Sequence, residues 1–185
     1  MKISRLMATL VFSLFCIGSF AAAPTVDAPL STLTIEERGE LTMSGDDFKF
    51  IPWNSDKHLG QVQVIQYFGA TMGDSKIFEP FTDLLQESLE PGTVQVTTVL
   101  NMDAAMWGTS GFVISELEKN KRLHPESTMV IDDDGAGVSE WDLGEAGSGL
   151  IILDAKGVVK FVTLKKMSED EMASALALIK SNAKS

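Results

Sequence analysis

Methionines follow two segments of this sequence that read as buried strands. Met72 comes shortly after residues 62–68. Met102 and Met106 come directly after residues 93–101, which are also rich in β-branched and apolar side chains. Ligands of an open sheet bind beyond the carboxyl ends of its parallel strands, so these thioethers could share one site.

Thioethers select Cu(I), but methionine also fills gaps in cores and lines adaptable binding surfaces. Core packing, a groove for a peptide or protein, and a copper site therefore all stay open. The candidate groove residues are Met102, Asp103, Met106 and Trp107.

A run of acids offers a second candidate. Asp132, Asp133 and Asp134 are consecutive, and residues 132–145 hold six acids. Calcium binds several carboxylates on a flexible loop, but the spaced pattern of a calcium-binding loop is absent. Consecutive aspartates point in different directions, and Asp favours turns, so a turn after a buried strand explains them. They remain weak metal candidates, and an acid- or metal-assisted enzyme built on this loop is the alternative function.

Ser75 is the third candidate, as a nucleophile. It would need a base, and the only histidines are His58 and His124. No G-x-S-x-G turn surrounds it, and a serine at the start of a helix is typically a cap. We therefore assign no catalytic residue and predict no cofactor.

The first 23 residues form a pattern typical of a secretory signal peptide. Two basic residues precede an apolar stretch at 6–20, and alanines at 21–23 suit cleavage. The apolar stretch is shorter than the roughly 20 residues that span a bilayer, so we expect a secreted protein with no membrane span after cleavage. Cleavage removes Cys16, the only cysteine. Without a thiol the remaining chain cannot be a thiol-disulfide oxidoreductase or a cysteine peroxidase.

Charge narrows the range of partners. The sequence has 15 basic and 26 acidic residues. Loss of Lys2 and Arg5 with the signal peptide leaves 13 basic residues and a net charge of −13. Such a surface repels polyanions, so we expect no nucleic-acid partner.

The rest of the chain, residues 24–185, predicts one domain that alternates strands and helices. Strands separated by helices indicate parallel pairing with right-handed crossovers, and a late hairpin adds antiparallel strands. The fold class is therefore α/β, with a mixed central sheet flanked by helices. Ser168 and Glu171 form a capping box for the last helix. The expected strands are two short ones joined by a turn near 37–40, then 62–68, 93–101, 127–132 and a hairpin over 150–164; the expected helices are 75–89, 112–123 and 168–182, and residues 44–61 are expected to be irregular.

Residues 64–80, VIQYFGATMGDSKIFEP, resemble the strand, C-x-x-C loop and proline-containing helix of thioredoxin-like proteins of the extended, peroxiredoxin- or TlpA-like kind. In that register Met72 and Ser75 occupy the two cysteine positions, with Gly73 and Asp74 between them. Gly149 stands where the family has a cis-proline. The resemblance implies a thioredoxin-like fold whose redox site is degenerate.

A second resemblance covers nearly the whole chain. The ordered stretches RGEL at 38–41, WNS at 53–55, TTVLN at 97–101 and GFV at 111–113 are similar to the YtfJ family. That family implies a periplasmic thioredoxin-like protein without the redox motif and supplies no catalytic residues. Our leading hypothesis is a redox-inert module that holds an envelope protein or peptide in the former active-site groove.

Overall fold

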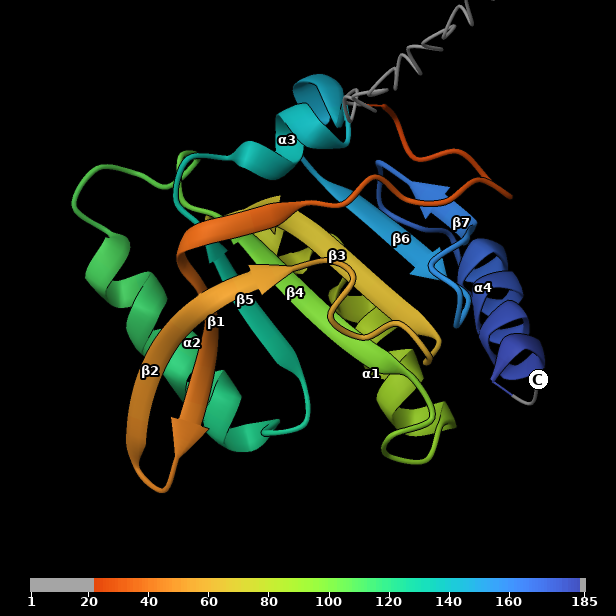
Figure 1. The fold of residues 1–185 in the computed structure, drawn as a ribbon, viewed down its shortest axis with the longest axis horizontal. Coiled ribbons are helices and arrows are strands. Elements are labelled where there is room, and N and C mark those ends of the chain that lie inside the picture. Colours follow the sequence, from red (N-terminus) through yellow and green to blue (C-terminus); the bar gives the residue numbers. More distant parts are fainter. Residues whose placement is uncertain (1–21, 184–185) are drawn as a thin grey trace, which may run out of the picture.

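A seven-stranded sheet organises the computed structural model, which describes residues 22–183 (Figure 1). The predicted signal peptide and Cys16 lie almost wholly outside this range, so that prediction stays untested. The strand order is β2-β1-β5-β4-β3-β6-β7. The strands are β1 Thr34–Ser44, β2 Asp47–Asn54, β3 Gln63–Gly69, β4 Gln95–Asn101, β5 Thr128–Asp132, β6 Gly149–Leu153 and β7 Val159–Thr163; the helices are α1 Glu79–Ser88, α2 Ser110–Leu123, α3 Ala136–Glu140 and α4 Glu169–Asn182.

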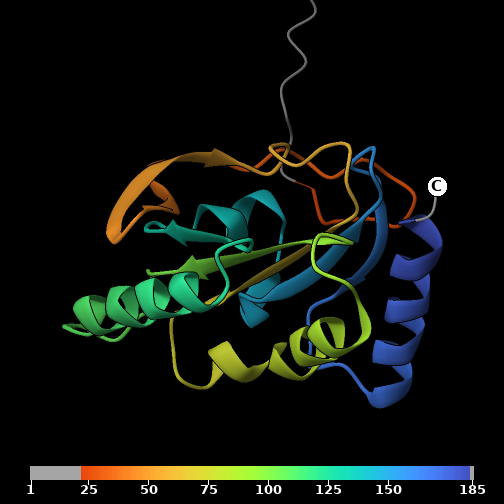
Figure 2. The ribbon, with the colours of Figure 1, turned by 90° about the horizontal axis from the view of Figure 1, so that it is seen from below.

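The parallel centre of the sheet determines where the helices lie. β3 pairs with β4, and β4 with β5, in parallel register. Because the chain moves from β3 to β4 to β5 in one direction, right-handed crossovers place α1 and α2 on the same face. Figure 2 shows α1 and α2 on that face and the short α3 on the other.

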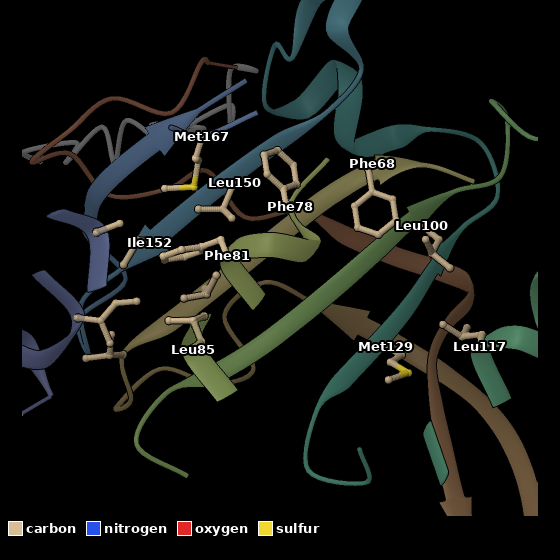
Figure 3. Packing of buried hydrophobic residues seen from close by; sticks show 14 of the residues in the cluster. Phe68, Phe78, Phe81, Leu85, Leu100, Leu117, Met129, Leu150, Ile152 and Met167 are labelled. Atoms are coloured by element: carbon tan, nitrogen blue, oxygen red, sulfur yellow. The ribbon is translucent and has the colours of Figure 1, made fainter. Parts of the chain in front are cut away.

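Each face of the sheet has its own hydrophobic core. The larger core packs α1, α2 and α4 against the sheet. Figure 3 shows Phe81 and Leu85 of α1 at one end of this core and Leu117 of α2 at the other. The opposite face buries Trp53 and Trp141 with residues of β3, β5 and β6. In the part of the chain that the structure describes, no helix is long and apolar enough to cross a membrane.

The N-terminal hairpin differs from the prediction. Residues 37–40 are not a turn between two short strands, because β1 continues through them as a bulge. Arg38 and Gly39 both have positive φ, at 53° and 71°, and the pairing with β2 shifts between Ile35 and Glu40. β2 itself occupies part of the segment expected to be irregular. Glycine permits this left-handed backbone, so the bulge bends one strand instead of ending it.

The helix expected over 75–89 begins later than predicted, because Asp74–Lys76 form a separate 3-10 turn and α1 starts only at Glu79, next to Pro80. Ser75 therefore does not cap α1, but two other features of the helix ends agree with the sequence patterns. Pro80 lies in the first turn of α1, where its missing N–H costs no hydrogen bond. The Ser168–Glu171 capping box is present at the start of α4. The late hairpin is β6 and β7, and β6 also pairs antiparallel with β3.

Candidate functional site

A groove of about 720 Å³ lies between α1 and α2 over the sheet. Phe68, Leu100 and Met129, from three neighbouring strands, form much of its floor (Figure 3). Leu117 of α2 contributes to one wall. The volume lies within the range of about 300–1,000 Å³ typical of ligand pockets, and an apolar floor suits an apolar side chain.

Polar side chains interrupt this apolar floor. Gln66 is 7% exposed and lies on the face of β3 where residues two positions away belong to the core. Its amide nitrogen donates to the Thr98 hydroxyl at 2.7 Å, and its oxygen accepts from the Thr82 hydroxyl at 3.1 Å. The network fixes the amide but leaves it one further N–H. The floor of the groove is therefore apolar except at this hydrogen-bonded amide and the two threonine hydroxyls.

Large apolar side chains stand exposed at one end of the groove. Met72, Met106 and Phe112 line it and are 82%, 73% and 65% exposed. They come from the loops after β3 and β4 and from the first turn of α2. A cluster of exposed apolar side chains beside a groove is typical of an interaction surface, and methionine adapts to differently shaped partners.

The degenerate redox positions lie at this same end. Met72 and Ser75 both line the groove. The Ser75 hydroxyl donates to the Met72 carbonyl at 3.2 Å. Asp74 accepts from the Thr71 hydroxyl at 2.8 Å, and Gly73 precedes it in an exposed turn. The four residues form a local turn in which the polar side chains of Asp74 and Ser75 bond within the segment 71–75, while the Met72 side chain is exposed.

The other predicted site residues are dispersed. Met102 is 8% exposed and packs in the larger core. Of the four predicted groove residues only Met106 lines the groove; Asp103 is exposed, and Trp107 is fully exposed beside it. Gly149 begins β6 opposite Tyr67 and is buried. The three thioethers therefore do not converge on one point.

Neither histidine activates Ser75. The His58 ring shares a hydrogen bond of 2.9 Å with Thr128, and His124 lies 3.9 Å from Glu126. Burial lowers the pKa of His58, and neighbouring Lys57 adds to that effect. Among residues 22–183, neither histidine is hydrogen-bonded to Ser75, so no Ser–His pair is formed there.

The acidic run is divided among three environments. Asp132 is buried and accepts hydrogen bonds from the Tyr67 hydroxyl at 2.8 Å and from the amides of Ala136 and Gly137. Asp133 forms an ion pair with Arg38 at 3.2 Å; burial raises the pKa of Asp133, and Arg38 opposes that rise. Asp134 is exposed. Across residues 22–183, no group of three or more His, Cys, Asp or Glu side chains is placed to hold a metal ion.

Titration of Tyr67 tests whether the hydrogen bonds around Asp132 are shielded from solvent. Burial, followed by the Asp132 charge and hydrogen bond, raises the pKa of Tyr67 far above its usual value of about 10. The folded state therefore keeps a proton that the unfolded state loses above about pH 10. We expect Tyr67 to lower the free energy of unfolding by about 1.4 kcal/mol per pH unit above that point.

Tyr67 is the only tyrosine, so tyrosinate absorbance reports it alone. The absorbance should appear together with loss of the folded circular dichroism signal, and the Tyr67→Phe variant should lack this component of the alkaline slope. Ionisation near pH 10 in the folded protein would show that the network is open to solvent.

Sequence reasoning missed most of the groove. Gln66, Thr82 and Thr98 carry no motif, and Phe112 was expected only as a residue of a helix. One signal was available: Gln66 is polar at a position where the alternation of β3 requires an apolar side chain. The groove itself depends on the distance between α1 and α2, which cannot be predicted from local sequence patterns.

The chain resembles known proteins in its sequence and in its fold. Residues 25–182 match the family described as bacterial protein of unknown function, YtfJ_HI0045. An uncharacterized protein from Haemophilus influenzae is 30% identical over 176 residues, covering 95% of this chain and 96% of that protein. The uncharacterized protein YtfJ of Escherichia coli is 32% identical over 146 residues, covering 78% and 79%.

Two solved structures illustrate the fold. One, assigned to the thiol:disulfide interchange protein DsbE of Chlorobium tepidum, has a TM-score of 0.59 at 14% identity and covers 88% of this chain and 100% of its own. The thioredoxin domain of a Bacteroides vulgatus thiol-disulfide oxidoreductase has a TM-score of 0.55 at 11% identity, covering 84% and 98%. This likeness shows the fold alone. It confirms the predicted thioredoxin-like architecture, a mixed sheet with flanking helices in a single domain.

Proposed function

The chain belongs to the YtfJ_HI0045 family, and we propose that it is a redox-inert, periplasmic polypeptide-binding module that holds its partner in the groove between α1 and α2. The observation that carries this proposal is the groove itself, with an apolar floor and exposed Met72, Met106 and Phe112 at one end. Burial of such side chains by a partner yields roughly 25 cal/mol per Å² of apolar surface removed from water.

Redox inertness rests on chemistry at the former cysteine positions. Met72 is a thioether and Ser75 an alcohol, and neither can attack a disulfide as a thiolate does. The Ser75 hydroxyl, moreover, is directed to a backbone carbonyl. Binding is thus the activity that the site supports best.

The acid- or metal-assisted enzyme on residues 132–145 has less support. Such an enzyme needs carboxylates that converge on one point. Instead, Asp132 accepts hydrogen bonds from Tyr67 and two backbone amides, and Asp133 forms an ion pair with Arg38. No specific observation favours it.

Site-specific photo-crosslinking tests the binding function. A photoreactive residue at Met72 or Met106 should capture a partner in intact cells, and the same residue at Leu59 should not. Leu59 is a suitable control because it is an exposed apolar residue, at 52%, that does not line the groove.

A second substitution ties capture to the groove. Thr98→Phe places a ring on the groove floor and should abolish crosslinking from Met72, while circular dichroism confirms that the protein is folded. Equal capture from Met72 and Leu59, or capture that survives Thr98→Phe, would contradict the proposal.

A further inference from the structure

We propose that the occupant of the groove is a basic amphipathic segment of a partner protein, with apolar side chains on the groove floor and lysine or arginine side chains at its rim. This inference rests on the proposed binding function and adds the chemistry of the partner. It follows from the charges that surround the apolar floor.

Acids line both walls of the groove. Glu79 and Asp83 lie on α1, and Glu116 lies on α2. None of the described residues that line the groove is lysine or arginine. The rim is therefore negative on both sides, and an occupant that carries positive charge meets complementary potential along its length.

Within residues 22–183, the α1 acids that line the groove form no ion pair. Glu79 and Asp83 are both exposed. Glu116 lies 3.6 Å from Lys119, but both side chains are largely exposed, so this pair contributes little. Glu79 and Asp83 therefore remain available to a positively charged group of a partner.

The spacing of these acids sets a pattern for the partner. Glu79 and Asp83 are four residues apart on one helix, so their Cα atoms are separated by about 6 Å along its axis. Basic side chains at positions i and i+2 of an extended segment, about 6.7 Å apart, match this spacing. Basic side chains at i and i+4 of a helical segment match it equally well.

Other occupants are opposed by charge. The full chain carries a formal net charge of −11, so a second copy of it would bring like charge to the negative rim. Anionic lipid headgroups and nucleic acids are repelled for the same reason. A basic polypeptide is attracted at long range and can also bury apolar side chains on the floor.

Fluorescence anisotropy with designed peptides tests this. The probes are a labelled peptide that alternates lysine with leucine and a counterpart that alternates glutamate with leucine. The lysine peptide should bind at least tenfold more tightly at low salt, and its affinity should fall as salt rises.

The rim is tested with a matched pair of double variants. Glu79→Gln/Asp83→Asn should weaken binding of the lysine peptide roughly two- to thirtyfold, as expected for the loss of two exposed ion pairs. Glu87→Gln/Glu90→Gln changes net charge equally, at exposed positions of α1 and just beyond it that do not line the groove. That control should retain the affinity of the unmodified protein.

The outcomes separate this inference from the proposed function. If both peptides bind equally, Thr98→Phe abolishes both, and the rim variant has no effect, the groove binds polypeptide but the preference for basic segments is wrong. If neither peptide binds, or Thr98→Phe leaves binding intact, the groove function itself fails. Groove-dependent binding to anionic phosphatidylglycerol vesicles, or dimerisation that Thr98→Phe abolishes, would replace the basic segment with a membrane or a second copy.

Discussion

Replacing Asp132 with alanine is expected to lower the free energy of unfolding by about 3–5 kcal/mol. The carboxylate is 1% exposed and accepts three hydrogen bonds, from the Tyr67 hydroxyl and the amides of Ala136 and Gly137. Its loss leaves two buried donors, the Tyr67 hydroxyl and the Gly137 amide, without their acceptor, at about 1–3 kcal/mol each, while the part-buried Ala136 amide can bond to water and adds less. Chemical denaturation followed by circular dichroism measures the effect.

Two controls make this result specific. Asp134→Ala changes an exposed neighbour in the same acidic run and should alter stability by no more than about 0.5 kcal/mol. Calcium should not restore the Asp132→Ala variant, nor should it stabilise the unmodified protein. Equal losses for the two variants, or a calcium-dependent rise in the denaturation midpoint, would instead support a cation site on residues 132–134.

The overall fold could be predicted because its signals are local. The β-branched run at 62–68, the capping box at Ser168 and the proline at the start of α1 each act within a few residues. Their order then restricts the topology, since parallel strands with right-handed crossovers leave few arrangements. β2 was not predicted because it forms by pairing with β1, and β1 continues through the bulge at Arg38 and Gly39 instead of ending there.

The site was less predictable because it depends on tertiary spacing. Met72 and Met106 were identified from strand ends and do line the groove. Met102 was identified in the same way, but its side chain turns into the core. A strand end restricts a residue to one edge of the sheet without setting the direction of its side chain. Gln66 and Thr98 become neighbours only through the register of β3 and β4.

Asp132 and the groove lie on opposite faces of the sheet. Asp132 connects β5 to the start of α3, and the neighbouring Asp133 connects the same loop to the β1 bulge through Arg38. These contacts hold the carboxyl edge of the sheet on one side. The groove lies on the other face, where Met72 and Met106 remain exposed. The fold thus places its buried hydrogen-bonded acid on one face and its exposed methionines on the other, the arrangement on which the proposed binding function rests.

Replacing Gly39 with alanine is expected to destabilise the protein by about 2–5 kcal/mol. Gly39 has a φ of +71°, and a Cβ atom there would lie 2.3 Å from the Ile51 carbonyl oxygen. The left-handed backbone costs a residue with a side chain about 1–2 kcal/mol. Displacement of the β2 backbone adds about 1–3 kcal/mol, as for other overpacked sites. Equilibrium denaturation would measure the sum.

Gly45→Ala separates these two contributions. Gly45 also has a positive φ, at +60°, but a Cβ atom there would meet no atom within 4 Å. This variant should therefore lose only about 1–2 kcal/mol, from the backbone strain alone. The difference between the two variants measures how closely β2 packs on the bulge of β1. Equal losses would mean that β2 moves aside at little cost, so that the close approach of the Ile51 carbonyl to Gly39 contributes nothing to the choice of glycine there.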